Sequence, residues 1–347
     1  MNRRLGVPLW TTVHGTEIRH IIRGMTSYLA KGTLLPEDFS LPVDQPFTTR
    51  QARRLGVRPE LLTRWCAQDL VRRMLKGVYV ATSIEDSLTL RATALEFVVP
   101  PTAVVTDETA AWLFGADVLP PGSHLEIPPV CMFQLAGNNR LRNQLCASGQ
   151  RTLLPEDLTA VEGIKVTTPI RTAWDLGRLR NRDRAIVALD GLLRLGMFER
   201  DELVEGVERF RRERGVVQLR ELVPLADARA QSPAESVMRL RWLDGPSLPP
   251  PTPQTPVFDA SGNEVFHLDL GIQEIKFGAE YDGEEWHSSD EDKKYDEQRR
   301  GWIKRQGWTI RILRERNVFG ADQNAWVLFQ EGIAEARRKM SAFRPRR

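Results

Sequence analysis

The stretch from His267 to Trp308 constrains this chain more than any other. It reads HLDLGIQEIKFGAEYDGEEWHSSDEDKKYDEQRRGWIKRQGW. Successive side chains of a strand point to opposite faces of a sheet. That alternation puts Phe266, Leu268 and Leu270 on one face and His267 and Asp269 on the other. It also gives Glu280 and Asp282 of KFGAEYDG a common side. The sequence therefore predicts three carboxylates gathered on one face of a sheet.

Carboxylates packed this closely repel one another and need compensation. A divalent cation supplies it, and a set of hard oxygen ligands suits Mg²⁺, with Mn²⁺ as a substitute. Such an ion can activate water and neutralise charge on a scissile phosphate. Asp269, Glu280 and Asp282 are the predicted metal ligands. The alternative is an exposed carboxylate-rich edge without an ion, because charged residues often alternate with apolar ones on half-exposed strands.

The flanking segments complete a recognisable order of elements. Ser232 and Pro233 begin a helix that carries Glu235 near its positive end, and a proline cluster then forces an extended connection. A hairpin and a further strand follow, and then a basic helix, DEDKKYDEQRRGWIKRQ, with Lys293 and Arg299, and the strand TIRIL. The pattern predicts helix, strand, strand, strand, helix, strand.

Near the other end, residues 47–82 have the pattern of a winged helix-turn-helix. A short helix ends at Gly56, a second begins at Pro59, and LVRRMLKGVYVA alternates around a turn. Eight basic residues stand against two acidic ones between Arg50 and Lys76, which favours a phosphate-contacting face. The residues predicted to contact DNA are Arg58, Arg64, Arg72 and Arg73 in this segment, together with Lys293 and Arg299 of the later basic helix. The alternative is a winged helix used for protein contact, with solvated arginines.

The remaining residues define the predicted organisation of the chain. Its 347 residues favour two or three domains: residues 1–46 as extension and linker, 47–82 as winged helix, 83–230 as a mixed α+β middle domain, and 231–347 as the C-terminal domain with its basic tail. The expected fold class is multidomain α/β. Three cysteines without a CxxC pair, and no long apolar run, predict a cytoplasmic protein without a membrane partner.

The C-terminal segment resembles the PD-(D/E)xK nuclease superfamily, in its very-short-patch-repair-like branch, whose core is αβββαβ. The matching residues are Glu235, Ser236, Arg239, Asp269, Glu280, Asp282, Gly283, His287, Asp296, Arg299, Gly307, Trp308 and Arg311. The resemblance implies hydrolysis of DNA phosphodiesters with Mg²⁺, and a catalytic set of Glu235, Asp269, Glu280, Asp282 and His287.

One departure from the superfamily pattern leaves the general base open. Asp282 stands where the superfamily usually has lysine, a replacement familiar in this branch. His287 is a candidate to orient or deprotonate water, because an unperturbed imidazole titrates near ~6.5, and a structural cap on the following helix is its alternative role. Lys276 or Lys293 could supply positive charge in the transition state.

The N-terminal segment resembles the winged-helix domain of abortive-infection antitoxins of type IV toxin–antitoxin systems. The matching residues are Thr48, Thr49, Ala52, Gly56, Val57, Gly77, Val78 and Tyr79, with a later phrase at Thr168, Pro169, Arg171, Thr172, Asp175 and Leu176. Within that phrase, Arg171 and Asp175 have the i, i+4 spacing of an ion pair.

Three functions are consistent with these patterns. The first is an endodeoxyribonuclease targeted by its winged helix, in defence against foreign DNA or in a toxin–antitoxin setting. The second is an antitoxin-type DNA-binding regulator that keeps an inactive nuclease fold as a scaffold. The third is a nuclease acting on RNA or on branched repair intermediates. The expected partners are DNA, a cognate toxin or antitoxin protein, and a second copy of the chain.

Overall fold

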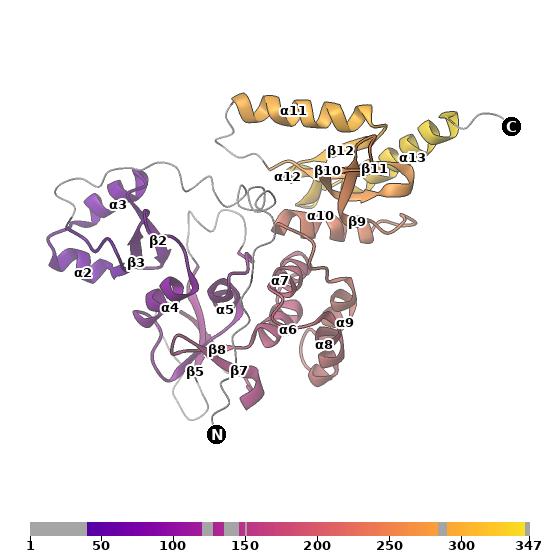
Figure 1. Ribbon diagram of the computed structural model, residues 1–347. Helices are drawn as coiled ribbons and strands as arrows, with labels where there is room; N and C mark the ends of the chain where they lie inside the picture. Colours follow the sequence, from indigo (N-terminus) through magenta and orange to yellow (C-terminus); the bar gives the residue numbers. More distant parts are fainter. Residues whose placement is uncertain (1–39, 120–127, 135–145, 150, 284–289, 344–347) are drawn as a thin grey trace, which may run out of the picture. The chain divides into compact units, whose positions relative to one another are not determined.

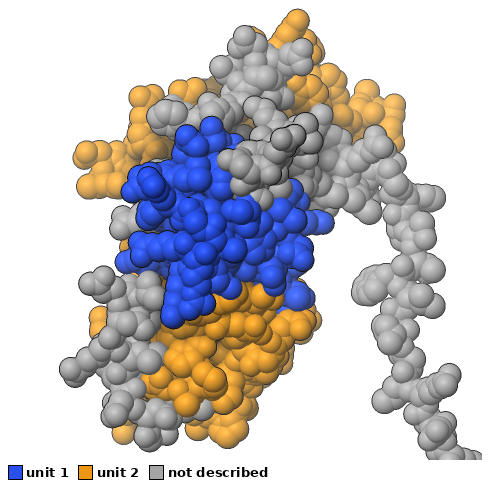
Figure 2. Space-filling model, turned by 90° about the vertical axis from the view of Figure 1, so that its left-hand side faces the viewer, with its two compact units in different colours: residues 1–90 blue, residues 91–347 orange. Residues whose placement is uncertain are grey.

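The computed structural model describes residues 40–119, 128–134, 146–149, 151–283 and 290–343 (Figure 1). The chain forms two compact units, one ending at Leu90 and one beginning at Arg91 (Figure 2). The architecture is mixed α/β, as the sequence predicts. In the described residues, none of the helices combines the length and apolar character that a bilayer crossing requires.

The first unit contains helices and a small sheet at the places predicted for a winged helix. Its elements are β1 (Phe47–Thr48), α2 (Thr49–Arg54), α3 (Pro59–Ala67), β2 (Val71–Leu75) and β3 (Val78–Ala81), with sheet order β1-β3-β2. Thr48 caps α2 by accepting a hydrogen bond from the Gln51 amide, and the Gln51 side chain accepts one from the Thr48 amide. Helix α4 (Leu88–Glu96) spans the boundary between the units.

The second unit begins with a mixed sheet and a group of helices. The strands are β4 (Ala103–Val105), β5 (Val130–Gln134), β6 (Cys146–Gly149), β7 (Leu158–Val161) and β8 (Ile164–Thr167), in the order β6-β5-β4-β8-β7. The helices are α5 (Asp107–Phe114), α6 (Pro169–Leu179), α7 (Arg182–Arg194), α8 (Arg200–Glu205) and α9 (Val216–Leu222). Buried residues of α6 and α7 form the centre of the core of this part.

The chain between Arg200 and Leu222 forms two helices separated by a break. Helix α8 passes into a 3-10 segment at Gly206, and α9 begins only after Gly215, which has φ +80°. A Cβ atom at Gly206 would lie 1.9 Å from Cζ2 of Trp174. The close approach to this tryptophan explains why glycine occupies the break.

The last part of the second unit has the predicted order of elements. It comprises α10 (Pro233–Leu243), β9 (Thr252–Phe258), β10 (Glu264–Ile272), β11 (Phe277–Tyr281), α11 (Asp290–Arg305), β12 (Thr309–Leu313), α12 (Glu315–Val318) and α13 (Ala325–Phe343). The sheet order is β12-β11-β10-β9, with β11 and β12 parallel and the other pairs antiparallel. Figure 1 shows α10 and α11 on opposite sides of this sheet.

One prediction from strand alternation is wrong. Leu268 packs in the cluster that includes Ile303 of α11, whereas Leu270 packs with α10 and α13. Two leucines of equal parity therefore belong to different cores. Gln254, which lies opposite Asp269 on β9, has φ +50°, so the backbone departs from regular strand geometry between the two leucine pairs.

The middle and C-terminal parts are joined by a buried ion pair. Arg239 of α10 lies 2.7 Å from Asp190 of α7, and both side chains are almost fully buried. Arg239 also donates a hydrogen bond to the Leu225 carbonyl. The boundary predicted between residues 230 and 231 falls in the connection before α10, and helix α10 then packs on α7 within the same compact unit.

Candidate active site

Asp269 is the carboxylate around which the candidate site is arranged. It lies in β10, and its Oδ2 atom accepts a hydrogen bond of 2.7 Å from the Tyr281 amide of β11. Burial, followed by the charges of Glu235 and Glu280, raises the pKa of Asp269 from 3.8 to about 8 against the opposing effect of the Tyr281 amide and Arg299. Three carboxylates from α10, β10 and β11 are therefore close enough to interact.

Glu235 is held by two hydrogen bonds at the start of α10. Ser232 caps this helix and accepts from the Glu235 amide, as the sequence predicts. The Glu235 Oε2 atom accepts from the Gln231 amide at 2.9 Å and from Nε2 of Gln254 at 3.0 Å. Burial raises the pKa of Glu235 despite these donors. The carboxylate thus combines a structural contact at the helix start with a place beside Asp269.

Glu280 is the most buried of the predicted carboxylates, at 4% exposed. Arg299 Nη2 lies 2.6 Å from its Oε1 atom and Arg300 Nε lies 3.2 Å from its Oε2 atom. Arg299 also donates to the His267 carbonyl and stacks on the Phe266 ring. Helix α11 therefore brings two guanidinium groups onto the carboxylate, a compensation that the sequence analysis assigned to a metal ion.

Asp282 lies beyond the end of β11 and is half-buried. Its Oδ2 atom is 3.6 Å from Nη1 of Arg300 and 3.9 Å from Nη2 of Arg314. These distances are at the long end of ion pairing, so Asp282 is held less firmly than Glu280. The arginines nevertheless connect the two carboxylates into one charged group.

The donor set suits a hard cation, but it is not a preformed metal site. Oxygen ligands of Asp and Glu are those that Mg²⁺ prefers, and Oε1 of Glu280 is buried without a hydrogen bond of good geometry. In the part of the chain that the structure describes, however, no three or more acidic, His or Cys side chains are arranged to hold an ion. Metal binding would therefore require Glu280 to exchange arginine contacts for the ion.

The structure does not place every residue predicted for catalysis. His287 and the side chain of Lys293 lie outside the described residues. Lys276 precedes β11, whereas Glu280 lies near the other end of that strand. The Nζ atom of Lys276 donates a hydrogen bond to the Gln306 carbonyl. The general base therefore stays open, and Lys276 is not positioned to supply charge at the carboxylates.

Two contributors to the site were missed from the sequence. Arg300 was predicted only as part of a basic helix, and the residue spacing gave no sign that it pairs with Glu280. Gln254 sits between prolines in PTPQTP, where nothing marks it as a contact of Glu235. Both contacts join elements that are distant in sequence, so only the tertiary structure reveals them.

The arginines predicted to contact DNA in the first unit differ in their surroundings. Arg58, the N-cap residue of α3, and Arg64, within that helix, are both exposed. Arg72 Nη2 donates to the Ile84 carbonyl, while Arg73 Nη2 donates to the Tyr79 hydroxyl and stacks on that ring. The first two are thus better placed to meet phosphate than the second two.

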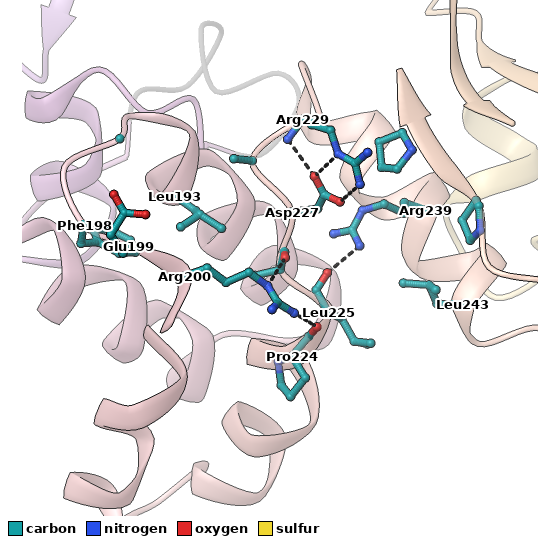
Figure 3. A pocket seen from close by; sticks show the side chains of 15 residues that line it. Leu193, Phe198, Glu199, Arg200, Pro224, Leu225, Asp227, Arg229, Arg239 and Leu243 are labelled. Atoms are coloured by element: carbon teal, nitrogen blue, oxygen red, sulfur yellow. Dashed lines mark hydrogen bonds and ion pairs between the residues drawn. The ribbon is translucent and has the colours of Figure 1, made fainter. Parts of the chain in front are cut away.

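A cavity of about 670 Å³ lies elsewhere in the second unit (Figure 3). Its lining includes Phe198, Arg200, Leu225, Arg229, Arg239 and Pro253. Arg229 pairs with Asp227, and Arg200 donates to backbone carbonyls (Figure 3). The predicted carboxylates are not part of this lining, so the cavity is separate from the candidate site.

A second concentration of charge lies at α6, where Arg171 and Asp175 form a buried ion pair of 2.9 Å. Asp175 also contacts Arg151 and Arg178, and Arg171 contacts Asp157. The i, i+4 pair predicted from the sequence is therefore the centre of a buried network that fastens α6 to its neighbours.

Comparison with known proteins identifies this middle part. Residues 102–225 match the family model described as the AbiEi antitoxin C-terminal domain. Two Mycobacterium tuberculosis proteins, the uncharacterized proteins MT2308 (strain CDC 1551 / Oshkosh) and Rv2248 (strain ATCC 25618 / H37Rv), are each 34% identical over 239 residues, 69% of this chain and 83% of the relative. The chain belongs to the same family as these mycobacterial proteins. The match to an AbiEi antitoxin domain supports the antitoxin resemblance seen in the sequence, including the phrase around Arg171, and fits a toxin–antitoxin setting.

Proposed function

We propose that this protein is a metal-dependent DNA endonuclease whose first unit binds DNA. The observation that carries the proposal is the carboxylate of Asp269, drawn close to Glu235 and Glu280 with its pKa raised to about 8. Strongly perturbed carboxylates of this kind are typical of functional sites. An opposite charge beside a carboxylate lowers its pKa, whereas burial and the neighbouring carboxylates raise the pKa of Asp269.

In this proposal Asp269, Glu280 and Asp282 hold Mg²⁺, with Mn²⁺ as a substitute. The ion supplies Lewis acidity and neutralises charge on the phosphate. Arg299 and Arg300, which contact Glu280, would supply positive charge to a phosphodiester bound beside such an ion. Glu235 orients the cluster from the α10 side, and His287 is the candidate for handling the proton of the attacking water.

The test is cleavage of plasmid, linear duplex, single-stranded DNA and RNA by the purified chain with Mg²⁺ or with chelator. The variants Asp269→Asn and Glu280→Gln keep the size of each side chain and remove its charge. Glu297→Gln, an exposed carboxylate of the same basic helix, is the matched control. We expect Mg²⁺-dependent cleavage that both site variants abolish and the control retains; cleavage that survives both substitutions would refute the site.

A second function, an antitoxin-type DNA-binding regulator, is favoured by the AbiEi match over residues 102–225. Its prediction is different: the chain should bind its own promoter DNA in chelator as tightly as in Mg²⁺, and Asp269→Asn should not change that binding. Specific binding without cleavage of any nucleic acid would replace the nuclease with the regulator.

A further inference from the structure

Gln254 stands out in β9 because its backbone is in a region that L-residues avoid. Its φ is +50°, the left-handed region in which glycine is comfortable and a side chain is strained. The other described non-glycine residues with positive φ lie in turns, in loops or at helix ends, whereas Gln254 lies inside a strand. Strain kept inside a regular element is a reason to ask what the side chain does.

The strained backbone directs the Gln254 side chain to the candidate site. Leu268 pairs with Thr255 and Leu270 with Pro253, which leaves Gln254 opposite Asp269 in the strand ladder. Its Nε2 atom donates a hydrogen bond of 3.0 Å to Oε2 of Glu235. A local irregularity of a strand next to a functional site commonly re-aims one side chain.

We propose that Gln254 is a positioning residue that holds the Glu235 carboxylate beside Asp269. This inference rests on the proposed nuclease function. Glycine at position 254 would relieve the backbone but lose the amide, so the retention of glutamine is explained by its hydrogen bond. Without that donor, Glu235 keeps the Gln231 amide and the Ser232 hydroxyl, which both belong to the chain at the start of α10 and do not fix the carboxylate against the sheet.

The decisive variant is Gln254→Gly in the full chain, because it removes the amide and relieves the strain at once. A merely structural role predicts that this change is harmless or favourable in every measurement. Ser247→Gly is the matched control: Ser247 also has positive φ, at +61°, and lies in the connection between α10 and β9. Both variants are expected to melt at or slightly above the wild-type temperature, by about 2–4 °C at most.

There are two functional readouts. The first is the affinity for Mn²⁺, measured from the electron paramagnetic resonance signal of the free ion, and the second is the rate of DNA cleavage. Residues that orient metal-site carboxylates typically change such quantities by about 10- to 100-fold. We expect Gln254→Gly to lose about tenfold or more in both, and Ser247→Gly to match wild type. Wild-type Mn²⁺ affinity and cleavage in Gln254→Gly would overturn the inference.

A double-mutant cycle in melting temperature separates this inference from the proposed function. Gln254→Gly, Glu235→Ala and the double variant are compared in chelator, where neither metal binding nor cleavage enters. Non-additive shifts support the Gln254–Glu235 contact even if the wild type cleaves nothing, an outcome that would refute only the nuclease. Additive shifts would overturn the inference whatever the activity.

Discussion

The stability of Asp269→Asn in the absence of metal is the most informative single measurement on this protein. The asparagine side-chain oxygen can still accept the Tyr281 amide hydrogen bond, while the buried negative charge is removed. The pKa of Asp269 is raised to about 8 in the folded chain by burial and by Glu235 and Glu280. The folded state therefore holds a proton that the unfolded state releases, and the variant is expected to be the more stable protein.

The magnitude follows from the difference between the two pKa values. A rise from 3.8 to about 8, at about 1.4 kcal/mol for each pH unit, sets a ceiling of roughly 6 kcal/mol. The carboxyl of Asp269 is buried, but the residue as a whole is partly exposed and its neighbours can relax. A gain on the order of 1–3 kcal/mol is therefore expected at pH 8. In a chain of this size that corresponds to several degrees in melting temperature.

The sign of the pH dependence is fixed by the raised pKa. Below about pH 4 the carboxyl is protonated in both states, and wild type and variant should melt together. As the pH rises from about 4 to 8, the wild type loses stability because only its unfolded state releases the proton freely. The asparagine variant lacks this loss, so the gap between the two widens over that window.

Thermal unfolding in chelator at pH 4, 6 and 8 measures this directly, and a repeat with saturating Mg²⁺ tests the proposed ligand role. The ion should stabilise the wild type and not the variant, reducing or reversing the gap. Glu297→Gln should follow wild type throughout. If Asp269→Asn is no more stable than wild type at pH 8 in chelator, the carboxylate cluster described here is wrong.

Three other expectations follow from contacts in both units. Arg239→Met leaves its buried aspartate partner on α7 unpaired and should lower the free energy of unfolding in urea by about 3–5 kcal/mol; a loss below 1 kcal/mol would contradict the pairing. Gly206→Ala places a Cβ 1.9 Å from the Trp174 ring and should cost about 1–3 kcal/mol by the same measurement, whereas an unchanged midpoint would show that the ring moves freely. Replacing Arg58 and Arg64 together by alanine should weaken DNA binding and reduce the slope of log K against log salt by roughly 2, and an unchanged slope would remove these arginines from the interface.

The elements of this fold were predictable where local chemistry decides them. Ser232 caps α10 and Pro233 opens it, and Thr48 caps α2, because these contacts involve residues three apart in sequence. The hairpin turn around Gly262 and the strand–helix junction at Pro169 are local in the same sense. Each of these features is determined by neighbouring residues, so a single sequence suffices to locate it.

Contacts between distant elements were not predictable in this way. Strand alternation assigned Leu268 and Leu270 to one face, whereas the structure assigns them to different cores on either side of the position where Gln254 of β9 has φ +50°. The pairing of Arg300 with Glu280 depends on how α11 lies over the sheet. Alternation predicts on which face of the sheet each side chain of a regular strand lies. Tertiary packing decides where the actual strand departs from that regular geometry.

Because arginines of α11 pair with Glu280 and Asp282, these two carboxylates are weak evidence for a catalytic site. Three clustered carboxylates in the sequence predict a metal ion, because uncompensated charges repel. Glu280 and Asp282 are in fact compensated by guanidinium groups, and a buried ion-pair network of this kind can persist without any ion. Asp269 has no such close partner among the described residues, and its pKa stays high despite the more distant charge of Arg299. The proposal of a nuclease therefore depends on Asp269. Of the three carboxylates, it is the one whose replacement by a neutral side chain is expected to stabilise a protein that served only as a scaffold.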